Sequence, residues 1–102
     1  MAAGTQSVPV TAISNVFVFA YANVANNSAG AYSYIQVACG GTVVGLENHS
    51  VSNSANQEHG VATGGFKLNL AVGTYSFTMM KKVSGGTGTF YSPQMSILVL
   101  PA

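Results

Sequence analysis

The chain has 102 residues, and only five of them carry a full charge: Glu47, Glu58, Lys67, Lys81 and Lys82. Soluble domains average about 25% charged residues, whereas this chain has 5% and a formal net charge of +1. The composition therefore lacks the basic surface that nucleic-acid binders need, and it predicts one domain whose surface is largely covered by other protein.

Short alternating or apolar runs separated by Gly, Asn, Ser and Pro predict an all-β antiparallel sandwich of about eight to ten strands. Met1–Ser7 is expected to be a flexible lead, and Val8–Ser14 to be the first strand. Asn15–Val24 has no polar side, because Phe17, Phe19 and Tyr21 alternate with small aliphatic residues. We expect this strand to be buried on both faces, by the core and by a neighbouring subunit.

The next strand is predicted over Ala31–Cys39, after a turn at Ala25–Gly30. Its aliphatic side is expected to face the core, while Tyr32 and Tyr34 form an amphipathic side that suits an interface. A short strand at Thr42–Leu46 is expected to follow.

The polar stretch Glu47–Gly60 is predicted to be a long loop with one short strand around Val51. Phe66–Val72 then alternates, so its apolar residues are expected to point inward and its other residues outward. The inward set is Phe66, Leu68, Leu70 and Val72; the outward set is Lys67, Asn69 and Ala71. Three more strands are predicted at Thr74–Val83, Thr89–Tyr91 and Met95–Leu100, separated by a hairpin loop at Ser84–Gly88 and a turn at Ser92 and Pro93.

Three segments in the last third carry a resemblance to a known family. Leu68–Val83 reads LNLAVGTYSFTMMKKV, Ser84–Phe90 reads SGGTGTF, and Ser96–Pro101 reads SILVLP. Together they resemble the C-terminal half of C1q/TNF-like jelly-roll domains, with an apolar strand, a G-x-Y-x-F strand, a glycine-rich hairpin and a final apolar strand. The resemblance implies a jelly roll that forms a homotrimer through an aromatic and aliphatic face.

Small jelly rolls poor in charge and cysteine are similar to virion proteins of tailed bacteriophages, and the short form most resembles capsid decoration (cement) proteins. This likeness implies a non-enzymatic structural protein, made in the host cytoplasm, that binds the major capsid protein on the capsid surface. The candidate trimer or capsid interface residues are Phe17, Phe19, Tyr21, Tyr32 and Tyr34. The segment with Val8, Val10, Ala12 and Ile13 is a candidate extension onto the capsid or the next subunit.

Two other functions stay open. The first is a receptor- or glycan-binding tip of a phage tail fibre or spike, although the sequence has no shaft repeat of the kind that fibres carry. The second is a soluble C1q/TNF-like signalling ligand, which the missing basic leader disfavours, since no Lys or Arg precedes Lys67. The longest apolar run, Val16–Ala22, is much shorter than the roughly 20 residues of a membrane span.

Catalytic and metal-binding chemistry is weakly represented. Glu47 with His49, and Glu58 with His59, offer oxygen and nitrogen ligands, but their spacing matches no standard metal site. The single cysteine, Cys39, lies beside two glycines in an apolar run and is expected to be packed rather than reactive. The sequence predicts no enzyme, no metal and no cofactor.

Overall fold

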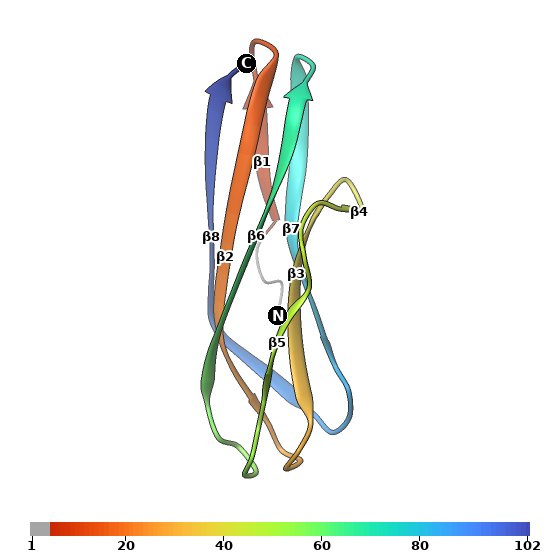
Figure 1. The fold of residues 1–102 in the computed structure, drawn as a ribbon, viewed down its shortest axis with the longest axis vertical. Coiled ribbons are helices and arrows are strands. Elements are labelled where there is room, and N and C mark those ends of the chain that lie inside the picture. Colours follow the sequence, from red (N-terminus) through yellow and green to blue (C-terminus); the bar gives the residue numbers. More distant parts are fainter. Residues whose placement is uncertain (1–4) are drawn as a thin grey trace.

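The computed structural model describes residues 5–102 and consists of two antiparallel β-sheets packed against each other (Figure 1). Within these residues the regular structure is entirely strand, which confirms the all-β sandwich expected from the sequence. The strands are β1 (Thr5–Val10), β2 (Ser14–Asn26), β3 (Tyr32–Cys39), β4 (Thr42–Val43), β5 (Asn48–Val51), β6 (His59–Leu70), β7 (Gly73–Val83) and β8 (Gly88–Pro101). The short strand expected around Val51 is β5.

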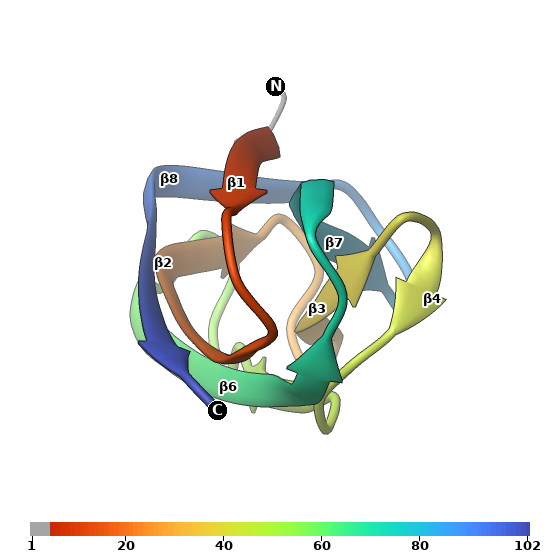
Figure 2. The ribbon, with the colours of Figure 1, turned by 90° about the horizontal axis from the view of Figure 1, so that it is seen from above.

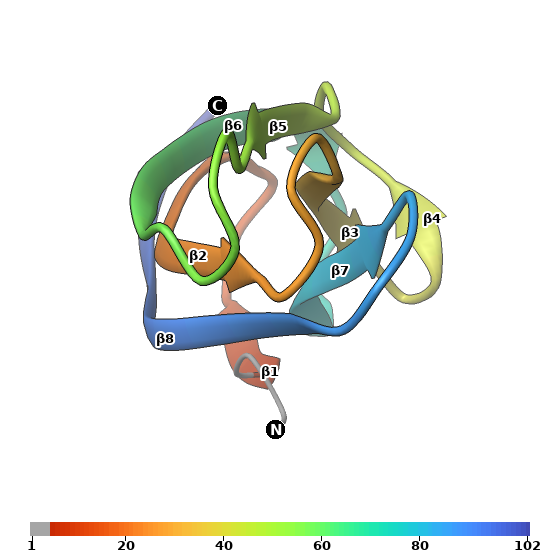
Figure 3. The same cartoon turned by 90° about the horizontal axis from the view of Figure 1, so that it is seen from below.

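The larger sheet has the order β1-β7-β3, with β4 and β5 pairing in succession along the remaining edge of β3, and the smaller sheet has the order β6-β2-β8. Viewed down the long axis, β8, β2 and β6 occupy one side of the molecule, and β7 and β3 the other (Figure 2, Figure 3). The molecule is elongated, with extents of 48 × 20 × 18 Å. The double Greek-key connectivity that defines a jelly roll stays a prediction.

The core lies between the sheets because alternate residues of the central strands point toward each other. From β2 it receives Val16 and Val18, which are fully buried. From the other sheet it receives Ile35, Val37 and the aromatic ring of Phe77, all with no exposed surface. The remaining buried members of the cluster are Val8, Val10, Ala20, Ala22, Val24, Cys39, Val61, Met79 and Phe90.

Two contacts close the sides of the sandwich. On one side the backbone amide of Phe66 donates to the carbonyl of Val44 over 3.2 Å, next to a bridge between Gly45 and Gly65. Both positions require glycine, because a Cβ at either one would overlap the facing backbone. On the other side the Gln6 amide donates to the Met95 carbonyl over 2.8 Å, which links β1 to β8.

The two strands predicted at Thr89–Tyr91 and Met95–Leu100 are one strand, β8, which runs without interruption through Ser92 and Pro93. Ser92 has a left-handed backbone conformation with φ of 47°. The pairing register with β2 shifts at this level, between Tyr21 and Asn23. The predicted turn is therefore wrong, and the Ser-Pro pair forms a bulge that bends one long strand; the bend is visible in Figure 1.

The inward direction predicted for three residues of Phe66–Val72 is also wrong. Phe66, Leu68 and Val72 are exposed, at 57%, 54% and 66%, whereas Leu70 packs against the core as expected. Lys67, expected to point outward, pairs with the core residue Val16 and is half-buried. Phe66 and Leu68 are exposed because Lys67, which alternates with them, takes the core side of β6. The register with β2 then shifts beside Asn69, whose φ is 56°, so Leu70 turns back toward the core. Val72 lies beyond the end of β6.

The N-terminal expectations need correction as well. Thr5–Ser7 form the start of β1 rather than a flexible lead, and residues 1–4 of that predicted lead lie outside the described residues. Val8 and Val10 are 8% and 2% exposed and belong to the core, so of the candidate extension only Ala12 and Ile13 are exposed.

Candidate functional site: an uncharged sheet face and a tyrosine pocket

The outer side of the β6-β2-β8 sheet is built by the alternation of β2. Val16, Val18 and Ala20 point into the core, so Phe17, Phe19 and Tyr21 point away from it. Neighbouring strands add apolar residues in register, because Phe17 pairs with Phe66 on β6 and with Leu98 on β8. The rings of Phe17 and Phe66 are 6.3 Å apart.

We call this surface the outer apolar face. It consists of Phe17, Phe19, Tyr21, Phe66, Leu68, Tyr91, Leu98 and Leu100. Phe17 is half-buried by its neighbours, and the other seven are exposed; Phe19 is the most open, at 60%. Because β2, β6 and β8 run along the long axis of the molecule, the face is a long strip (Figure 1).

None of the five charged residues lies on the outer apolar face. Lys67 is on β6 but points to the opposite side from Phe66, and it lines a cleft with Cys39, Thr42 and Tyr75. The other charges lie elsewhere: Lys81 and Lys82 on β7, Glu47 between β4 and β5, and Glu58 in the loop before β6.

Of the two tyrosines on the outer apolar face, Tyr21 has a hydrogen-bond partner within the chain. The Tyr21 hydroxyl donates to the side-chain oxygen of Asn23 over 2.8 Å. Its ring lies over Gly60, where a Cβ would come within 2.7 Å of the Tyr21 hydroxyl oxygen. The face can therefore be covered without leaving this hydroxyl unpaired.

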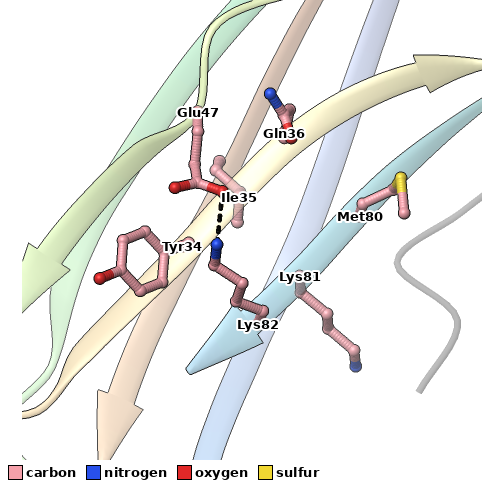
Figure 4. Close-up of a pocket in the computed structure, with 7 residues that line it drawn as sticks. All are labelled: Tyr34, Ile35, Gln36, Glu47, Met80, Lys81 and Lys82. Atoms are coloured by element: carbon pink, nitrogen blue, oxygen red, sulfur yellow. Dashed lines mark ion pairs between the residues drawn. The ribbon is translucent and has the colours of Figure 1, made fainter. Parts of the chain in front are cut away.

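A second surface, the tyrosine pocket, lies on the outer side of the larger sheet (Figure 4). It is a shallow hollow of about 180 Å³ over β3 and β7, lined by Tyr34, Ile35, Gln36, Glu47, Met80, Lys81 and Lys82. The Lys82 ammonium lies 3.0 Å from the Glu47 carboxylate and 4.7 Å from the centre of the Tyr34 ring. In Figure 4 the Lys81 side chain points away from this ion pair, and its ammonium lies 5.4 Å from the Phe90 ring.

Aromatic contacts continue along β3 beside the tyrosine pocket. Tyr32 and Tyr34 meet edge to face with ring centres 6.1 Å apart. The His49 ring from β5 lies 5.0 Å from Tyr32 and 5.5 Å from Tyr34. The three rings form one cluster on the outer side of the larger sheet.

The structure divides the five predicted interface residues between two surfaces. Phe17, Phe19 and Tyr21 belong to the outer apolar face, whereas Tyr32 and Tyr34 lie on the other sheet with the charged tyrosine pocket. Sequence reasoning missed that Phe66 and Leu68 complete the outer apolar face. The sequence of β2 could have indicated this, because β2 is apolar on both sides. Its outer side therefore needs apolar residues on the neighbouring strands, as its inner side does.

Across residues 5–102 there is no group of three or more His, Cys, Asp and Glu side chains that could hold a metal. Cys39 is a buried free thiol. The same part of the chain has no helix long and apolar enough to cross a bilayer.

The fold and these surfaces define a charge-poor β-sandwich with one uncharged aromatic and aliphatic face. No family model, no curated protein and no solved structure matches the chain.

Proposed function

We propose that this chain is a non-enzymatic virion structural protein that binds the assembled capsid of a tailed phage as a homotrimer and stabilises it. The observation that carries the proposal is the combination of five charges in 102 residues with thirteen large apolar side chains, counted over residues 5–102, that are at least 41% exposed. Such a surface is better suited to contact with protein than with water. The C1q/TNF-like sequence pattern of the last third supports the trimer and the phage capsid as the context.

The mechanism is thermodynamic linkage. A protein that binds only the assembled lattice stabilises it by the free energy of binding. A trimer holds three copies of the capsid-binding surface together, so weak individual contacts combine through their high effective concentration. In this proposal the major capsid protein is the partner, and the protein is made in the host cytoplasm and resides on the outside of the virion.

The test uses undecorated capsids of the phage that encodes the chain. The purified protein should sediment with these capsids, and saturating amounts should raise the temperature at which the capsids release their DNA or dissociate. Failure to sediment with capsids at micromolar concentrations, with no change in capsid thermal stability, would refute the proposal.

The tyrosine pocket favours one second candidate, a receptor- or glycan-binding tip. The half-buried ring of Tyr34, beside a carboxylate, an amide and an ammonium group, could stack against a sugar ring and bind its hydroxyls. Binding of the protein to host cells or isolated surface glycans in the absence of capsids, lost in Tyr34→Ala, would support this function over capsid decoration.

A further inference from the structure

We infer that the outer apolar face is the surface through which copies of this chain pack against one another. The inference rests on the homotrimer of the proposed function and names the side of the sandwich that forms it. A three-fold arrangement would turn the β6-β2-β8 sheet of each subunit toward a common axis, so that each face contacts both neighbours.

The absence of charge on the face argues for self-packing. A charge buried at an interface is costly unless a charge of opposite sign on the other molecule pairs with it in good geometry. The outer apolar face avoids this cost, since Lys67 is turned inward and the other four charged residues lie outside the β6-β2-β8 sheet. Two copies can therefore meet through this face without burying an unpaired charge.

The exposed area is of the size that a stable oligomer needs. With about 200 Å² for a fully exposed large side chain, the seven exposed members of the face present roughly 700 Å². The largest apolar patch of an ordinary monomer is about 300–600 Å², and a stable interface buries about 800 Å² on each partner. The face alone therefore comes close to a complete interface.

The outer side of the larger sheet is less suited to this role. Self-packing there would cover the Lys82–Glu47 ion pair and the His49 ring. Removing an exposed ion pair from water carries a desolvation cost that close packing repays only with good geometry. This side is consequently left free for the capsid or the solvent.

Paired substitutions on the two sheets test the inference. Phe19→Thr with Leu98→Thr removes apolar surface from the outer apolar face, while Tyr32→Thr with Met80→Thr does the same at similarly exposed positions of the larger sheet. Threonine keeps a high strand propensity, so both variants should fold, which circular dichroism and cooperative unfolding would verify. If the first variant fails to fold, the single change Phe66→Thr replaces it.

Light scattering and sedimentation equilibrium give the mass of each protein in solution. The inference predicts a wild-type mass about three times the 10.4 kDa chain mass. It predicts that Phe19→Thr/Leu98→Thr weakens assembly by at least about 100-fold, because two large apolar side chains are lost from the interface. The control variant should keep the wild-type mass.

Three results would overturn the inference: a monomeric wild type at about 100 µM, dissociation of the control variant alone, or two variants that both assemble as the wild type does. A monomer that inserts into neutral lipid vesicles would assign the face to a membrane instead. Capsid binding is measured separately. A trimer that does not bind capsids refutes the capsid function and leaves the inference standing. A monomer that binds capsids refutes the inference and leaves the capsid function standing.

Discussion

Asn26 is the buried polar residue whose removal should cost the chain most. It is the last residue of β2, it is 1% exposed, and it lies at the end of the sandwich where the loops after β2, β5 and β7 gather (Figure 1). Its side-chain amide donates to the carbonyl of Gly85 over 2.8 Å, and its side-chain oxygen accepts from the amide of Ser28 over 2.9 Å. Its backbone carbonyl accepts from the amide of Asn56 over 2.7 Å. One residue therefore joins three loops.

The cost of Asn26→Ala follows from the two side-chain bonds. A typical hydrogen bond contributes about 1 kcal/mol, and a buried group left without its partner costs about 1–3 kcal/mol. Gly85 and Ser28 are exposed, so water can reach the carbonyl and the amide that would lose Asn26 as a partner. We expect a loss of about 2 kcal/mol in the free energy of unfolding, about 1 kcal/mol for each lost bond, against the roughly 5–15 kcal/mol of a small domain.

Urea unfolding followed by circular dichroism, at one fixed protein concentration because the chain is proposed to self-associate, measures this loss. Asn27→Ala is the matched control. Asn27 is exposed, and its side-chain oxygen accepts from the amide of Thr87 and, over a long 3.5 Å, from the hydroxyl of Ser28. Water can replace both bonds, so the loss should stay below about 1 kcal/mol.

Asn26→Asp separates hydrogen bonding from packing. The carboxylate keeps the volume and the acceptor for Ser28, but it loses the donor to Gly85 and turns an oxygen toward that carbonyl. We expect it to be at least as destabilising as Asn26→Ala. An Asn26→Ala protein within about 0.5 kcal/mol of the wild type, or an Asn26→Asp protein as stable as the wild type, would refute the reasoning, since either is less than a single lost bond.

Two further substitutions test the closure of the sandwich and its surface electrostatics. Gly65→Ala places a Cβ against the backbone of Val44, so we expect an overpacking loss of about 1–3 kcal/mol in urea unfolding; Gly85→Ala, which meets no atom within 4 Å, should be nearly neutral. An equal loss in both variants would contradict the role of close backbone approach. Glu47→Gln removes the ion pair with Lys82, whose side chains are 36% and 61% exposed. The expected loss is below about 0.5 kcal/mol and should vanish at 1 M salt, whereas a larger loss that persists in salt would show that the pair is not an ordinary surface one.

The alternation of residue types was sufficient to predict most of the strands. Ala31–Cys39 and Thr74–Val83 were predicted within one residue of β3 and β7, because each has one aliphatic side and one side that is more polar. The bounds of β6 were less accurate. It begins at His59, seven residues before the predicted strand, since its first half is rich in small and polar residues that resemble a loop.

The candidate interface was only partly predictable. The two apolar sides of Asn15–Val24 correctly indicated that Phe19 and Tyr21 lie on a surface other than the core. The same reasoning failed for Phe66 and Leu68, which were assigned to the core because they are the apolar half of an alternating strand. Alternation identifies which residues share a side, but it does not state which side faces the core.

The sequence alone determined the strand-rich architecture, the scarcity of charge and the two apolar sides of β2, because these depend on residue type and on spacing along the chain. The tertiary structure decided which side of β6 is exposed, how β8 passes Ser92 without a turn, and that Asn26 is buried beneath three loops. These features depend on pairing between residues far apart in sequence, such as Phe17 with Phe66 and Asn26 with Gly85. Local preferences cannot specify such pairings, since each is selected by the packing of the whole sandwich.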